Sequence, residues 1–123
     1  MVVGIHHVQI SMAPEQIASS RKFYMELLGM REIHDPFASD GGCWLAAGPS
    51  QQVHLRVERT VDRSTTRAHP ALMVSDLADC RERLTAEKFP IFEQPKIEGF
   101  DRIHTIDPSG NRIEVIQPDG QQV

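Results

Sequence analysis

The pattern of one half of the chain recurs in the other half, and this repeat constrains the fold more than any other feature. His7 begins an alternating, strand-like run, HVQIS, and His69 begins another, HPALMV, 62 positions later (69 minus 7). His54 lies within VHLRV, and Glu114 lies within IEVIQ, 60 positions later (114 minus 54). The two near-equal offsets predict a duplicated module in which each copy supplies two polar strand residues.

The first half is predicted to run strand, helix and then three strands. Residues 3–11 alternate between apolar and polar, which favours a strand. Helical spacing of apolar residues follows, with Pro14 suited to the first turn and Gly29 to the end. Three further strands are expected at 30–33, 43–47 and 52–58.

The second half repeats this order. Its helix is expected to follow Ser75 and Asp76, which can cap a helix start, and to carry its apolar stripe through Leu77, Cys80 and Leu84. A strong turn signal, DPSGN, is predicted at 107–111. Strands are expected at 69–74, 89–92, 102–106 and 112–117.

Length and composition favour one compact domain. A chain of 123 residues is long enough for a real core and too short for two independent ones. Within it, we expect module one at about 3–59, a polar linker at 60–67 and module two at about 68–118. Only a few polar residues at the C-terminus lack a structural pattern.

Charge and hydropathy exclude several classes of partner. The formal charge of −4, with no face rich in Lys and Arg, argues against nucleic acid. The apolar runs are far shorter than the roughly 20 residues that span a bilayer, and no secretory signal opens the chain. Cys43 and Cys80 make a poor disulfide framework, so we expect a cytoplasmic protein with reduced thiols.

Alternation within the strands predicts which side chains share a face. If Val53, Leu55, Ile113 and Val115 lie under helices, the residues between them lie on the opposite face of the sheet. That face is expected to collect polar and ring-bearing side chains, with Trp44 as a wall of a cavity: His7, Gln9, Trp44, His54, Arg56, His69, Arg102, His104 and Glu114.

The chemistry of this face predicts a metal site between the halves. Three imidazoles and a carboxylate, from His7, His54, His69 and Glu114, can fill the inner sphere of a divalent first-row metal ion. Candidate metals are zinc, nickel, manganese and iron. Arg56 and Arg102 suit an anionic or carbonyl-bearing substrate, because guanidinium offers a fork of hydrogen-bond donors. Gln9, Trp44 and His104 complete the predicted substrate contacts.

Four stretches give the chain a resemblance to the vicinal oxygen chelate superfamily, which includes glyoxalase I, bleomycin-resistance proteins and extradiol dioxygenases. They are HHVQIS, FYMELLGM, HPALMVSDL and DPSGNRIEVIQ, and together they extend over nearly the whole chain. The resemblance implies an α+β fold, in which paired βαβββ modules form an open, cupped mixed sheet with helices on its outer face. It also implies a homodimer, often with the cup completed by modules from both subunits.

The resemblance also implies roles for individual residues. His7, His69 and Glu114 match metal ligands that fosfomycin-resistance transferases use, and His104 falls where those proteins carry a substrate-contacting tyrosine. His54 matches a position that is glutamate in glyoxalase I and glutamine in methylmalonyl-CoA epimerase. This difference argues against a simple glyoxalase assignment.

Two functions follow as expectations. The first is a metal-dependent enzyme that acts on a small substrate chelating through adjacent oxygens, with isomerase or lyase chemistry leading and dioxygenase chemistry the other option. Glu114 or His54 would act as general base. The second is a metal-free protein of the bleomycin-resistance type that binds a drug or metabolite in the cup.

Overall fold

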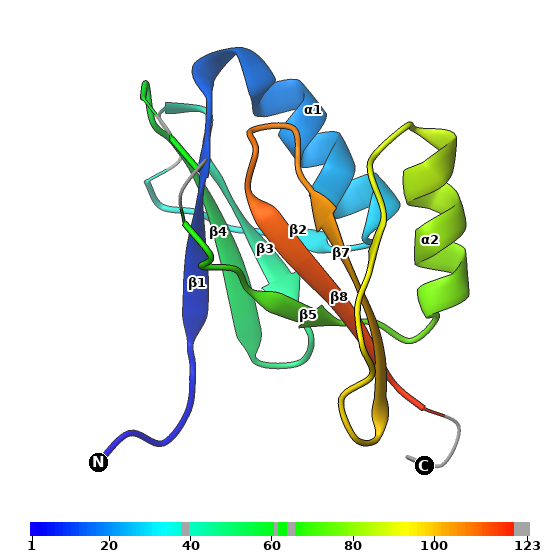
Figure 1. Ribbon diagram of the computed structural model, residues 1–123. Coiled ribbons are helices and arrows are strands. Elements are labelled where there is room, and N and C mark those ends of the chain that lie inside the picture. Colours follow the sequence, from blue (N-terminus) through cyan, green and yellow to red (C-terminus); the bar gives the residue numbers. More distant parts are fainter. Residues whose placement is uncertain (38–39, 61, 64–65, 120–123) are drawn as a thin grey trace. The chain divides into compact units, whose positions relative to one another are not determined.

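The structure is a computed structural model that describes residues 1–37, 40–60, 62–63 and 66–119. The chain divides into two compact units, Met1–Asp62 and Arg63–Val123, called unit 1 and unit 2 below. Each unit contains a four-stranded mixed sheet, with strand order β1-β4-β3-β2 in unit 1 and β5-β8-β7-β6 in unit 2 (Figure 1). The identical order confirms the predicted α+β fold of two βαβββ modules.

Unit 1 begins its sheet with β1 (His7–Met12), which pairs in parallel with β4 (Gln51–Val57). The predicted first helix is a composite of a 3-10 turn (η1, Pro14–Gln16), a short α-helix (α1, Ile17–Arg21) and a π-helical segment (η2, Lys22–Leu27). Gly29, with φ of 74°, ends it as predicted. The other strands of unit 1 are β2 (Arg31–Ile33) and β3 (Cys43–Ala47).

Unit 2 repeats the arrangement with one regular helix, α2 (Leu77–Ala86), which packs on β8. Asp76 caps this helix as predicted, because its side chain accepts a hydrogen bond from Asp79 N at 3.0 Å. The predicted turn at 107–111 forms with Gly110 at φ of 89°. The strands are β5 (Ala71–Met73), β6 (Phe92–Glu93), β7 (Phe100–Ile106) and β8 (Arg112–Pro118).

Three predicted strands start at least two residues too early, and one of them, expected at 69–74, begins at Ala71. The strand expected from residue 3 begins at His7. His6 O still accepts from Gln52 N at 3.1 Å, but residues 3–5 would align with the turn at 48–50 that precedes β4. The strand expected at 89–92 begins at Phe92. Phe89 N instead donates to Leu84 O at 2.9 Å and so closes the end of α2, while Pro90 has no N–H to donate to a ladder.

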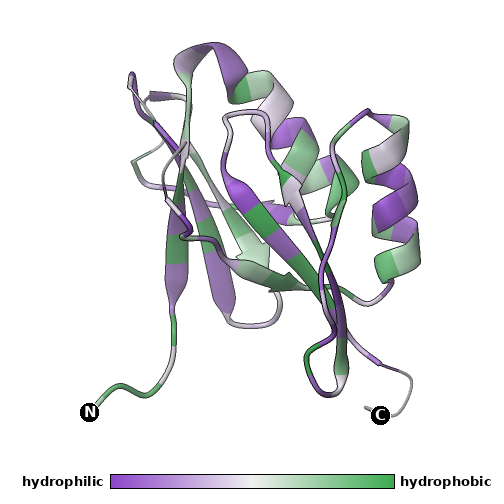
Figure 2. Ribbon diagram, viewed as in Figure 1, coloured by the Kyte–Doolittle hydropathy of each residue, from purple (hydrophilic) through white to green (hydrophobic). Residues whose placement is uncertain are grey.

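The alternation of each central strand separates core from site, as the sequence predicts. Val53 and Leu55 of β4, and Ile113 and Val115 of β8, are at most 1% exposed. The residues between them point to the other face, and Figure 2 shows the resulting hydrophobic and hydrophilic bands along β8. The core of unit 1 also takes Phe23 and Tyr24 from the composite helix, both fully buried.

In the part of the chain that the structure describes, no helix has both the length and the apolar character required to cross a membrane. The predicted linker, 60–67, lies partly outside the described residues, as do the last polar residues of the C-terminus, 120–123.

Removal of the α2 cap should destabilise unit 2. We expect Asp76→Ala to lower the free energy of unfolding by about 1 kcal/mol, because Asp79 N loses its acceptor. Asp76→Asn keeps an acceptor oxygen and should cost much less. The measurement is the midpoint of urea unfolding, and equal loss in both variants would contradict the capping role.

Candidate functional site

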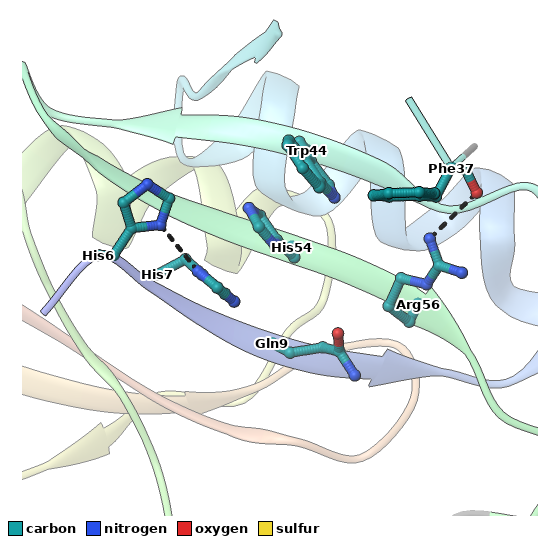
Figure 3. A pocket seen from close by; sticks show the side chains of 7 residues that line it. All are labelled: His6, His7, Gln9, Phe37, Trp44, His54 and Arg56. Atoms are coloured by element: carbon teal, nitrogen blue, oxygen red, sulfur yellow. Dashed lines mark hydrogen bonds between the residues drawn. The ribbon is translucent and has the colours of Figure 1, made fainter. Parts of the chain in front are cut away.

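A pocket of about 390 Å³ lies on the polar face of the unit 1 sheet (Figure 3). This volume falls within the range of small-molecule sites, about 300–1,000 Å³. Five of the lining residues were predicted from strand alternation, and two, His6 and Phe37, were not. The lining residues are His6, His7, Gln9, Phe37, Trp44, His54 and Arg56.

Three aromatic rings from adjacent strands stack across this pocket. The His54 ring lies between Trp44, at 4.1 Å and 3° between planes, and His7, at 3.9 Å and 17°. Register explains the arrangement, because Trp44 of β3 pairs directly with His54 of β4. Neighbouring strands are about 4.8 Å apart, so rings on one face come to stacking distance. Figure 3 shows the three rings in sequence over β3, β4 and β1.

The His54 imidazole is buried and oriented by a neighbour on the same strand. His54 Nε2 lies 2.8 Å from Gln52 Oε1, and an amide oxygen can only accept, so Nε2 carries the proton and Nδ1 carries the lone pair. Burial, and then the charge of neighbouring His7, lower the pKa of His54. The ring is therefore held neutral, the state needed for a ligand or a base.

Arg56 does not extend freely into the pocket. Its guanidinium contacts two loop carboxylates, Asp40 at 3.2 Å and Asp35 at 3.7 Å, and donates to the carbonyl oxygen of Phe37 at 3.2 Å. The predicted role of Arg56 as an anion contact stays a prediction. In the structure, its charge is already paired within unit 1.

Unit 2 brings two histidines, an arginine and a carboxylate together. One oxygen, Glu114 Oε1, lies 2.9 Å from His104 Nε2, 3.1 Å from Arg102 Nη1 and 3.2 Å from His69 Nε2. The register places His104 directly opposite Glu114, with Arg102 two residues away on the same face of β7. Potential ligand atoms of His69, His104 and Glu114 all lie within 4.8 Å of one another.

These contacts keep the carboxylate charged. Glu114 is only 4% exposed. Burial by itself raises the pKa of Glu114, but hydrogen bonds from His104, His69 and Arg102 outweigh it, so the pKa lies below its usual value. A buried carboxylate that stays ionised is a suitable ligand for a hard or borderline metal ion.

The contacts of His69 fit a metal ligand. His69 Nδ1 lies 2.9 Å from the carbonyl oxygen of Arg67, which can only accept, so Nδ1 carries the proton. Nε2 lies 3.2 Å from Glu114 Oε1 and donates to it only when the ring carries a second proton; in the neutral ring, Nε2 has a lone pair that a metal ion could bind. Two acceptors at this distance need a cation between them, or a proton on the ring. Metal-bound histidines commonly have their second nitrogen held by a backbone carbonyl in this way.

The predicted residues therefore form two groups. Unit 1 contains Gln9, Trp44, His54, Arg56 and His7, and unit 2 contains His69, Arg102, His104 and Glu114. That one metal ion takes ligands from both units stays a prediction. Phe37 was not predicted as a site residue, because it lies in a loop with no periodic pattern. His6 was not predicted either; it is exposed, and its Nδ1 lies 2.9 Å from His7 Nδ1.

Comparisons with known proteins agree with this geometry. Residues 4–115 match the profile of the Glyoxalase/Bleomycin resistance protein/Dioxygenase superfamily. A protein from Bacillus anthracis described as a glyoxalase family member is similar in structure, with 31% identity, a TM-score of 0.82, and coverage of 97% of this chain and 98% of that chain. A comparison with curated protein sequences gives no match.

More distant structures share the fold. A glyoxalase/dioxygenase from Nostoc punctiforme has 22% identity and a TM-score of 0.75, over 94% of this chain and 90% of that chain. A mutant of the fosfomycin resistance protein FosX from Listeria monocytogenes, complexed with Mn(II) and 1S,2S-dihydroxypropylphosphonic acid, has 15% identity and a TM-score of 0.74 over the same shares.

The duplicated sheet order, the profile match over most of the chain and the 31% identity lead to one conclusion. The chain belongs to the Glyoxalase/Bleomycin resistance protein/Dioxygenase superfamily.

Proposed function

We propose that this protein is a metal-dependent enzyme that acts on a small substrate chelating through adjacent oxygens, with isomerase or lyase chemistry leading and dioxygenase chemistry the other option. The observation that carries the proposal is the unit 2 cluster of His69, His104 and Glu114, whose ligand atoms lie within 4.8 Å. Imidazole and carboxylate donors together suit zinc, nickel, manganese or iron. The proposed ligands are His69 and Glu114 of this cluster, with His7 and His54 of unit 1.

The ligands of FosX support this substrate class. That protein binds Mn(II) together with a dihydroxy phosphonic acid, which has adjacent oxygens and a negative charge. In the present chain, Arg102 is the proposed contact for an anionic group, and His104, Gln9 and Trp44 are further proposed substrate contacts. We also propose one glyoxalase-like domain over residues 1–123 and a homodimer. Two buried free thiols, Cys43 and Cys80, support a cytoplasmic location.

A divalent metal ion would act as a Lewis acid that stabilises negative charge developing on a substrate oxygen. Side chains of the protein would accept the proton that leaves the substrate. Glu114 is kept ionised by its three donors, and His54 is kept neutral with its Nδ1 lone pair free of the Gln52 contact. Each is therefore unprotonated near neutral pH, which is the form that a general base must have before it reacts, and we propose them as the candidate general bases.

The alternative function is a metal-free protein that binds a drug or metabolite. The unit 1 pocket favours it, because the lining residues that the structure describes are aromatic or polar and include no carboxylate. Treatment with a chelator separates the two functions. A binding protein should keep its full ligand affinity, whereas the enzyme should lose turnover.

Metal content is the first prediction to test. We expect the purified protein to hold near one divalent metal ion per chain by elemental analysis, and His69→Ala, Glu114→Ala and His7→Ala to lose it while their circular dichroism stays native. The control is His34→Ala, which removes an exposed histidine outside both groups. Full metal occupancy in the three ligand variants would refute the assignment.

The acid dependence of stability tests the Glu114 cluster in the metal-free state. The pKa of Glu114 is lowered in the folded protein, so its contribution is present above its unfolded value of about 4.3 and is lost as pH falls through the folded value. Glu114→Gln should therefore be less stable than wild type at pH 7, by about 1–3 kcal/mol. The difference should shrink in acid.

The measurement is urea unfolding of chelator-treated protein across this pH range. Glu93→Gln serves as the control, because Glu93 is 68% exposed in its ion pair with Arg81 and such pairs contribute little. A stability difference for Glu114→Gln that stays constant down to acidic pH would show that the carboxylate charge is not its cause.

A further inference from the structure

We propose that the pocket of unit 1 binds an uncharged planar ring, an aromatic or conjugated part of the ligand, and that Arg56 positions the pocket wall instead of binding an anion. The inference rests on the proposed small-molecule function, because it names the part of that ligand which unit 1 holds.

The guanidinium of Arg56 is surrounded by more negative than positive charge. Asp40 Oδ2 lies 3.2 Å from Nη2, and Asp35 Oδ2 lies 3.7 Å from Nη1. One positive and two negative charges leave this group with a net charge of −1. The Asp35 side chain is only 3% exposed, so solvent screens it little. A carboxylate or phosphate on the ligand would have to displace a carboxylate of the protein.

The loop that supplies Asp40 is fixed at its end. Asp40 Oδ1 accepts from Gly42 N at 2.9 Å while Oδ2 contacts Arg56. Gly42 is packed against β4, since a Cβ there would lie 2.6 Å from the carbonyl oxygen of Leu55 and 3.0 Å from Asp40 Oδ1. A side chain at position 42 would collide with these atoms. Glycine therefore allows Gly42 N to stay within hydrogen-bond distance of Asp40 Oδ1, while Asp40 Oδ2 contacts Arg56.

The same contacts fix the backbone of Phe37 at the rim of the pocket. Phe37 N donates to Asp35 Oδ1 at 2.7 Å, and Phe37 O accepts from Arg56 Nη1 at 3.2 Å. The side chain, in contrast, is 64% exposed, and its ring lies 6.3 Å from the Trp44 ring at an angle of 56° (Figure 3). The backbone of Phe37 is therefore held in place by hydrogen bonds, and its exposed apolar ring is available for contact with a ligand.

Next to Phe37, the floor of the pocket also consists of aromatic rings. Trp44, His54 and His7 form a near-parallel stack, and Trp44 is half-buried. Gln9 and Arg56 supply polar atoms, and the guanidinium of Arg56 is already paired with Asp35 and Asp40. Aromatic pairs contribute beyond the area they bury when their rings stack or meet edge to face. A planar, uncharged ring of the ligand would make the most favourable contacts with these side chains.

The test uses three small probes of similar size: benzamide, cyclohexanecarboxamide and benzoate. Trp44 is the only tryptophan of the chain, so its indole N–H gives one signal in a nitrogen–proton NMR spectrum and reports on the pocket directly. We expect benzamide to shift this signal and saturate. Cyclohexanecarboxamide should bind roughly fivefold or more weakly, because its ring is not planar. Benzoate should bind no more tightly than benzamide.

Two variants sharpen the assignment. Phe37→Leu keeps an apolar side chain and should weaken benzamide roughly fivefold. Asp40→Asn removes one carboxylate from Arg56 and should raise the affinity for benzoate relative to benzamide roughly fivefold. Glu32→Gln is the matched control, because Glu32 pairs with Arg21 and does not line the pocket, and it should leave this ratio unchanged.

Several results would overturn the proposal: no saturable shift with benzamide, equal binding of the two amides, or tighter binding of benzoate to the wild type. The titrations are made on the full chain with and without a chelator. If benzamide binds equally in both but the protein holds no metal ion, the enzyme proposal fails and the pocket proposal stands. If metal is bound and benzamide is not, the reverse holds.

Discussion

The central strand of each sheet carries the register on which the candidate site depends. β4 pairs in parallel with β1 and antiparallel with β3, and β8 pairs in the same two ways with β5 and β7. Because side chains alternate, a slip of one residue in either strand would bury His54 or Glu114 among the core residues and expose Val53 or Val115. The fully buried valines oppose such a slip, so core packing and site geometry are set by the same ladders.

Although the two sheets share one strand order, their polar faces have different electrostatics. Unit 1 presents stacked rings, and its Arg56 is paired with loop carboxylates. Unit 2 presents an ionised glutamate whose Oε1 is approached by His69, His104 and Arg102. A buried carboxylate is strongly destabilised when its hydrogen-bond donors are removed, whereas a stacked ring tolerates the exchange of one aromatic partner for another. Duplication has therefore given one scaffold two kinds of surface.

Sequence alone was sufficient where periodicity carries the information. Alternation in 52–58 and 112–117 identified the face of His54 and Glu114, and the turn at 107–111 was recognised from its residue types. The same alternation placed His104 and Glu114 on one face. It could not show that they are direct neighbours, because register depends on the partner strand and not on the strand itself.

Loops explain what the sequence could not predict. Phe37, Asp35 and Asp40 lie in segments without periodic pattern, so nothing indicated that they surround Arg56. The predicted anion contact was based on the chemistry of arginine, and its partners became visible only in three dimensions. In the same way, the composite helix followed a helical pattern in sequence, but its division into 3-10, α and π segments is visible only in the structure.

The brevity of β6 has a consequence for the behaviour of the protein in concentrated solution. At the end of its sheet order, this strand spans only Phe92–Glu93, and Pro90 precedes it without an N–H group. An edge of two residues offers a foreign strand very few backbone groups to pair with, so growth of the sheet by addition of another chain is disfavoured. Pro90, which shortens the strand, thereby leaves this edge of the sheet poorly suited to pairing with another chain.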